Sequence, residues 1–233
     1  MNLVMFDIDG TLTATTDIDE GCYVQAVEAV LNIDNIDTDL THYTHVTDEG
    51  IAVEIIERHR GRKATEKELL DLRHYFVGLI EEHILDYPAD LHPIEGAGEM
   101  MADLSRRTDC AVSLATGGWQ ESAILKIRAA GLDIEDSPMA TSNDAISRED
   151  IMALSAERAC DRYNVDCYDS VVYVGDGMWD LRAAHAMGYH FVGVAEGSRA
   201  SQMRKEGANH IVPDFANREG FIGILETLWA DQP

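Results

Sequence analysis

The chain has 233 residues, 45% of them hydrophobic, which is enough for one large domain or a core with an inserted lobe. Its 43 acidic and 18 basic residues leave a net charge of −25. This charge argues against nucleic acid or an anionic membrane as partner, because both require a basic face. No run of about 18 apolar residues occurs, so we expect no membrane span.

The acidity has two interpretations, a salty cytoplasm or an ordinary soluble acidic protein, and only four of the basic residues are lysines. The four cysteines form no C-x-x-C pair and indicate reduced, mostly structural thiols. The first strand pattern begins at residue 3, so we expect no cleaved signal peptide. We expect a cytoplasmic protein that is a monomer or a homodimer.

The amino-terminal part of the chain has one strand pattern followed by helical patterns. A buried strand is predicted at 3–8, and helical spacing of apolar residues follows at 18–31, 50–60 and 66–85. A polar, turn-rich stretch covers 32–48, and Thr65 with Glu68 forms a capping box. Residues 15–92 are therefore predicted to be helical.

The remaining chain alternates between strand and helix patterns. Strands are predicted at 110–115, 138–141, 170–174, 190–194 and 210–212, and helices at 96–107, 120–130, 148–163, 179–187, 198–206 and 218–229. Such alternation is typical of a mostly parallel sheet with helices on both faces. We predict an α/β fold with a doubly wound, mostly parallel sheet. Its core is 1–14 and 93–233, and 15–92 form an inserted helical domain.

Two aspartates end the first predicted strand. Asp7 and Asp9 are two residues apart, so in an extended chain they point the same way, and Gly10 forms the turn that follows. Close carboxylates repel unless a cation joins them, and Mg²⁺ binds one or two carboxylates together with a substrate phosphate. A calcium loop counted from Asp7 would need Gly at Leu12 and Glu at Ile18, so that alternative fails.

Two further motifs follow predicted strands, and the carboxyl ends of parallel strands meet at one edge of a sheet. Thr116 and Gly117 follow an apolar strand, where a hydroxyl and exposed N–H groups suit phosphate oxygens. Asp176 follows another strand, and Asp180 lies one helical turn later, so it can face back toward Asp176. Read alone, both motifs also fit an ordinary turn or helix cap.

These motifs resemble those of the haloacid dehalogenase superfamily, in the subgroup with a helical C1-type cap that includes phosphoglycolate phosphatases. The resemblance extends over nearly the whole chain. It implies that Asp7 is the nucleophile that becomes an aspartyl-phosphate and that Asp9 is the general acid/base. Members that act on carbon–halogen bonds lack the second aspartate, so Asp9 indicates phosphoryl transfer. Gly10, Thr116 and Gly117 would bind phosphate.

The resemblance also implies a Mg²⁺ site. Asp7, Asp9 and Asp176 would be its ligands, and Asp180 would support the water shell or the adjacent backbone. The family usually has a lysine just before the helix that precedes the motif at Asp176, and this chain has none there. We expect Arg148 to replace it, because a guanidinium can bridge carboxylate and phosphate oxygens.

Two other cationic residues are rivals for the role of Arg148. Lys126 and Arg158 both fall within predicted helices, so we expect them to be less well placed. Loop residues near the helical insertion either face the site or are solvated; these are Thr15, Thr16, His45, Thr47 and Asp48. Trp119 and Trp179 are either walls of the pocket or buried core aromatics.

The sequence therefore predicts a Mg²⁺-dependent phosphatase that acts on a small anionic phosphorylated metabolite. A sugar phosphomutase of the same subgroup is one alternative, and it would differ by shielding the aspartyl-phosphate from water. A non-catalytic phospho-acceptor or binding protein is another. Receiver domains of that kind are much shorter, and their phosphorylated aspartate ends a middle strand.

Overall fold

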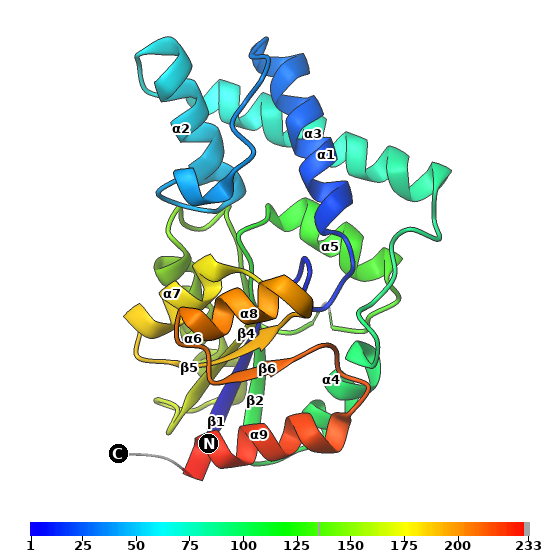
Figure 1. The fold of residues 1–233 in the computed structure, drawn as a ribbon, viewed down its shortest axis with the longest axis vertical. Helices are drawn as coiled ribbons and strands as arrows, with labels where there is room; N and C mark the ends of the chain where they lie inside the picture. The colour runs from blue at the N-terminus through cyan, green and yellow to red at the C-terminus, as the bar shows by residue number, and fades with distance from the viewer. Residues whose placement is uncertain (135, 231–233) are drawn as a thin grey trace.

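The structure, a computed structural model, describes residues 1–134 and 136–230 (Figure 1). Within them, six strands form one sheet with the order β3-β2-β1-β4-β5-β6, and every neighbouring pair is parallel. The strands are β1 Asn2–Phe6, β2 Cys110–Ala115, β3 Met139–Ala140, β4 Val171–Gly175, β5 His190–Val194 and β6 His210–Val212. The predicted doubly wound sheet is confirmed.

The helices also match the predicted elements closely. They are α1 Thr16–Ala26, α2 Asp48–Arg60, α3 Glu66–Asp86, α4 Ala97–Ser105, α5 Gln120–Ala129, α6 Arg148–Tyr163, α7 Met178–Ala186, α8 Gly197–Lys205 and α9 Arg218–Ala230. After α1 the chain continues as a π-helical turn, Val27–Leu31, which ends where Asn32 takes a left-handed φ of 51°. A 3₁₀ turn, Leu40–His42, lies in the stretch predicted as turn-rich. No helix in the described ranges combines the length and apolarity that a membrane crossing needs.

The sheet buries both of its faces. Side chains alternate along β1, so Val4 and Phe6 pack against α4, α5 and α9, while Leu3 and Met5 pack against α6, α7 and α8. All four side chains are fully buried. Burial on both faces explains why the strands appear in the sequence as continuous apolar runs instead of alternating ones.

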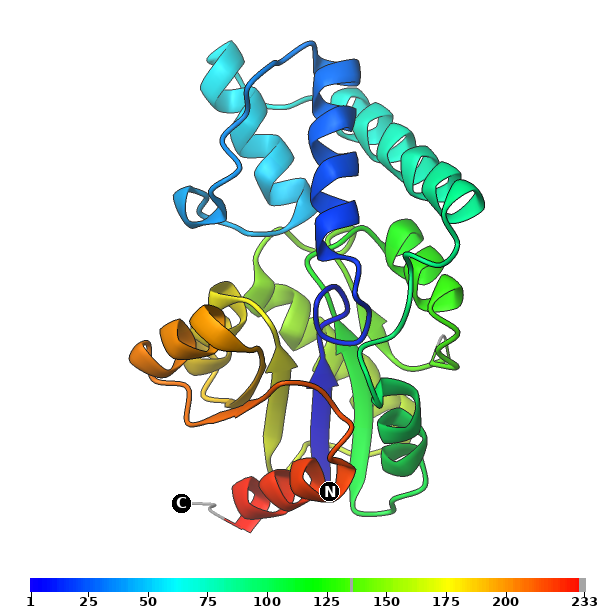
Figure 2. The same ribbon diagram turned by 45° about the vertical axis from the view of Figure 1, so that its right-hand side comes forward.

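A third apolar cluster holds together a helical lobe made of α1, α2 and α3, which lies over the carboxyl ends of the strands (Figure 2). Trp119, at the start of α5, belongs to this cluster although its helix packs on the sheet. Its ring lies 5.8 Å from that of Tyr23 and 5.5 Å from that of Phe76. Of the two alternatives for Trp119, the structure shows a buried core aromatic. It also joins the lobe to the sheet.

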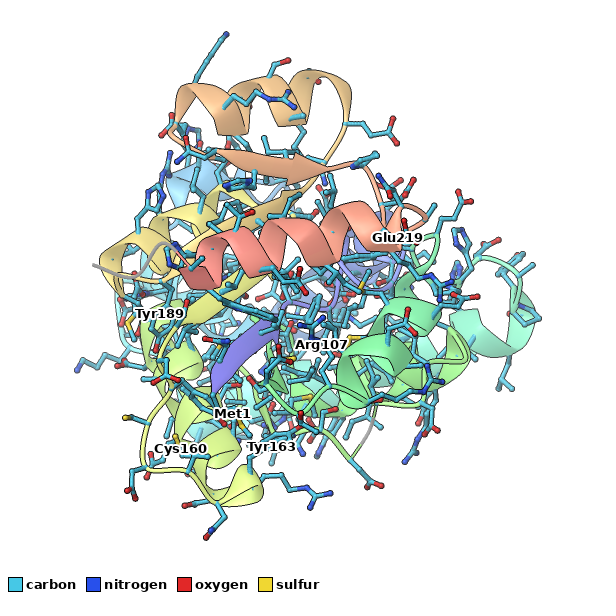
Figure 3. All side chains as sticks on the ribbon, turned by 90° about the horizontal axis from the view of Figure 1, so that it is seen from below. Met1, Arg107, Cys160, Tyr163, Tyr189 and Glu219 are labelled. Carbon is cyan, nitrogen blue, oxygen red and sulfur yellow. The ribbon has the colours of Figure 1, made fainter. Side chains whose placement is uncertain are left out.

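Surface ion pairs lie at the opposite end of the sheet. Seen from below, α9 crosses the molecule beside Arg107 (Figure 3). Arg107 donates from Nη2 to Asp109 at 2.7 Å and to Glu226 of α9 at 3.0 Å. The acidic motifs of the sequence all lie at the other end, where the lobe covers the sheet.

Candidate active site

The site begins where the two central strands end. The N–H of Asp7, just after β1, donates to the carbonyl of Val174 in β4 at 2.9 Å. Asp176 follows β4, and Asp180 lies on the first turn of α7; both are buried. The strand order reverses between β1 and β4, which is where α/β sheets bind their ligands.

Three buried carboxylates form one group at this point. Oxygen atoms of Asp7, Asp176 and Asp180 all lie within 4.8 Å of one another. Burial, followed by the charge of Asp180, raises the pKa of Asp7 well above its usual value and that of Asp176 to about 7. Burial also raises the pKa of Asp180. A divalent cation would relieve this repulsion, so the group fits Mg²⁺, a cation that prefers carboxylate oxygens.

The carboxylate of Asp9 is not part of this group. Its Oδ2 accepts a hydrogen bond from Lys126 Nζ at 2.7 Å, and its Oδ1 accepts one from Thr15 Oγ1 at 2.5 Å. The Lys126 ammonium also pairs with Asp19 of α1. Burial raises the pKa of Asp19 to about 6, although Lys126 opposes this. Lys126 therefore joins the end of β1 to the helical lobe.

Lys126 was expected to be less well placed than Arg148 because it falls within a helix. Its side chain is fully buried beside Asp9 and does not line the cavity that lies between the lobe and the acidic group. A lysine side chain is long enough to extend beyond the end of its helix to a neighbouring element. The other rival, Arg158, instead pairs with Asp144 at 2.6 Å, away from the acidic group.

Arg148, which was expected to replace the family's lysine, is the first residue of α6. Its Nη1 is 2.9 Å from Asp180 Oδ1 and 3.4 Å from Asp7 Oδ1, and its side chain is 11% exposed. Its Nη2 donates to the carbonyl of Val46 in the lobe at 3.2 Å. Its Nε is buried without a hydrogen-bond partner in the described ranges. Since a buried donor without a partner is unfavourable, this nitrogen is available to a bound anion.

Two glycines allow these groups to approach each other. Gly10 has a φ of +75°, and a Cβ there would lie 2.2 Å from Asp176 Oδ2. A Cβ on Gly117 would lie 2.5 Å from Arg148 Nη2. Thr116 is buried beside Gly117, and its Oγ1 accepts the N–H of Gly118 at 3.1 Å. A side chain at either glycine would therefore collide with Asp176 or Arg148.

The helical lobe is hydrogen-bonded to the core around the site. At the start of α2, Thr47 Oγ1 donates to the carbonyl of Ile146 at 2.8 Å. The N–H of Asp48 donates to the carbonyl of Gly117 at 2.8 Å. In return, Asp48 Oδ2 accepts the N–H of Trp119 at 2.8 Å. These bonds join the lobe directly to the motif at Thr116.

A cavity of about 140 Å³ lies between the lobe and the acidic group. Its lining includes Thr16, Thr47 and Asp48, for which the sequence left open a place at the site or in solvent. It also includes Trp179, for which the alternatives were a pocket wall or a buried core aromatic. His45 does not line it. The cavity contacts the candidate catalytic residues at one end; these are Asp7, Asp9, Thr116, Gly117, Arg148 and Asp176.

Two residues at the site were missed by the sequence analysis. Arg199 of α8 donates from Nη1 to Asp176 Oδ2 at 2.6 Å, although its side chain is about half exposed. Asp19 of α1 pairs with Lys126. Neither belongs to a recognisable motif, and each reaches the site only through the packing of its helix. No local pattern in the sequence could have identified them.

Comparisons with known proteins agree with this architecture. The family model for haloacid dehalogenase-like hydrolases matches residues 1–188. The chain therefore belongs to the haloacid dehalogenase-like hydrolases. A search of curated proteins finds no match.

Several solved structures share the fold. A hydrolase from Pseudomonas syringae is 21% identical with a TM-score of 0.73, over 95% of this chain and 99% of that chain. CbbY from Rhodobacter sphaeroides, in complex with phosphate, is 20% identical with a TM-score of 0.65, over 92% and 94%. A predicted phosphoglycolate phosphatase from Haemophilus somnus is 19% identical with a TM-score of 0.64, over 94% and 97%.

Proposed function

We propose that this enzyme is a Mg²⁺-dependent phosphatase that hydrolyses a small phosphomonoester through a phosphorylated Asp7. The observation that carries the proposal is the position of Asp7, which is buried between the carboxylates of Asp176 and Asp180 and the guanidinium of Arg148. CbbY, which shares the fold, was solved in complex with phosphate, and this supports a phosphate-containing ligand for this chain. Residues 15–92 would act as the cap that covers it.

Asp7, Asp176 and Asp180 would hold the Mg²⁺, with Asp180 acting directly or through water. The expected ligand set also contained Asp9, whose carboxylate is bonded instead to Lys126 and Thr15. When bound, Mg²⁺ would neutralise charge on the carboxylates and on the phosphate oxygens.

The chain's own residues would carry out two steps. In the first, a carboxylate oxygen of Asp7 attacks phosphorus, and the bond from phosphorus to the leaving oxygen breaks. Arg148, Thr116 and the N–H groups after Gly10 and Gly117 hold the phosphate oxygens. Asp9, protonated for this step, gives its proton to the departing alcohol.

In the second step, Asp9 accepts a proton from water as that water attacks the phosphorylated Asp7. Phosphate leaves, and the carboxylate of Asp7 is regenerated. Thr15 and Lys126 orient Asp9 through their hydrogen bonds. A Cβ on Gly118 would lie 3.5 Å from both Asp9 Oδ2 and Thr116 Oγ1, so the acid/base group and the phosphate-binding hydroxyl flank the same glycine.

The test is phosphate release from a panel of small phosphomonoesters, with Mg²⁺ and with a chelator. We expect release that depends on Mg²⁺. A sugar phosphomutase would instead interconvert sugar phosphates and release little phosphate. Absence of both activities, with no phosphorylated Asp7 detected by mass spectrometry, would refute the proposal.

A further inference from the structure

The cavity beyond the phosphate-binding end has mostly apolar walls, and all of the apolar residues except Trp179 of α7 come from the helical lobe. Its apolar lining residues are Tyr23, Val24, Ile36, Leu40, Val46, Ile51 and Trp179. If phosphate is bound by Asp7 and Arg148, the leaving alcohol of the substrate lies against these walls. This deduction rests on the proposed function.

The charged side chains of this cavity are almost all acidic. Beyond the catalytic group, its lining contains Asp19, Glu20, Asp37 and Asp48. Within the described residues, the one lysine or arginine of the lining is Arg148, which lies at the phosphate end. The cavity thus has one cation for the transferred phosphate and none for a second anionic group.

Two further cations lie near the cavity without lining it, and both are already paired. Arg199 donates to Asp176 at 2.6 Å. Lys126 is fully buried and does not line the cavity, and its ammonium is bonded to Asp9 and Asp19. A second anionic group in the cavity would therefore face acidic side chains without a free cation among the described residues to pair with.

We infer that the leaving alcohol of the substrate carries no anionic group, so the enzyme selects phosphate esters of small uncharged alcohols. Apolar walls contact the alcohol's carbon atoms, and the acidic residues exclude carboxylates and second phosphates. Glu20 of α1 is exposed, as is Asp37 of the same acidic set, and Glu20 is proposed to contribute to this exclusion.

Two esters of the same shape test the inference. Phosphoglycolate carries a carboxylate where glycolamide phosphate carries a neutral amide. We expect kcat/KM to be at least about tenfold higher for glycolamide phosphate, because like charges in a desolvated site repel. Binding of both esters to the Asp7→Asn variant, measured by calorimetry, should show the same preference without turnover.

The two measurements separate the inference from the proposed function. If glycolamide phosphate binds selectively but the parent enzyme hydrolyses neither ester, the proposed phosphatase activity is refuted while the inference about the alcohol stands. Equal kcat/KM and equal binding for the two esters would overturn the inference, and so would failure of both to bind. A preference for phosphoglycolate would also overturn it.

A charge reversal identifies the role of Glu20. Glu20→Arg should raise kcat/KM for phosphoglycolate relative to glycolamide phosphate by about tenfold, because it supplies the missing cation. Asp17→Arg is the matched control, since Asp17 is an exposed residue of the same helix that does not line the cavity. An equal change in both variants would show a general charge effect and contradict the role given to Glu20.

Discussion

Two buried cations lie at the site, and they serve different regions of the molecule. Arg148 is 11% exposed, contacts Asp7 and Asp180, and lines the cavity. Lys126 is fully buried, does not line the cavity, and joins Asp9 to Asp19 of the helical lobe. Solvent access separates their roles: Arg148 can contact a bound phosphate, whereas Lys126 stabilises the junction between core and lobe.

The largest expected effect concerns the phosphate end of the site. Asp7→Asn should lower kcat at least about a thousandfold, because the amide cannot act as the nucleophile. Phosphate release in the presence of Mg²⁺ measures this. Asp17→Asn, on the surface of α1, is the control and should retain activity. Activity of Asp7→Asn within about tenfold of the parent would contradict the mechanism.

Next in size is the contribution of Arg148. Arg148→Ala should lower kcat/KM by about a hundredfold or more, because it removes charge that stabilises the transferred phosphate. Arg158→Ala removes the same side chain from the same helix at a surface pair with Asp144, and should leave kcat/KM within about twofold. Similar losses in both variants would mean that Arg148 acts only through folding.

Lys126 is expected to affect stability more than phosphate binding. Lys126→Met leaves Asp9 and Asp19 without their buried partner and should lower the free energy of unfolding by about 3 kcal/mol. Urea denaturation measures this change. Lys67→Met breaks an exposed pair with Asp71 and should change stability by less than about 1 kcal/mol. If both variants unfold alike, the junction does not depend on Lys126.

The smallest effect is a pH-dependent stabilisation by Mg²⁺. The pKa of Asp176 is raised from 3.8 to about 7. Without metal, the folded state therefore binds a proton at this group between about pH 4 and pH 7 that the unfolded state has already lost. Stability from this group is therefore lost as the pH rises through that window. Saturating Mg²⁺ should raise Tm by about 5 °C at pH 8 and by less at pH 5.

Asp176→Asn should weaken this dependence on pH, because the amide does not titrate. Thermal unfolding of the parent and the variant at both pH values, with Mg²⁺ and with chelator, provides the comparison. An equal Mg²⁺ effect at pH 5 and pH 8 would contradict the assignment of the buried acidic group as the metal site.

The sequence by itself determined the order of strands and helices and the strand ends that carry the chemistry. Apolar runs followed by aspartates located Asp7 and Asp176, because a buried strand and the polar residue that ends it are local properties of the chain. The same logic located Thr116, whereas Arg148, the first residue of a predicted helix, was proposed only from the resemblance to the family. Their catalytic roles remain predictions.

Only the tertiary structure decided how these groups are paired. The partners of Lys126 lie 117 and 107 residues away in the chain, and Arg199 approaches Asp176 from another helix. The lobe likewise places its apolar walls and acidic residues over the site. Such pairings depend on how helices pack against the sheet, and a local sequence pattern carries no information about distances between remote segments.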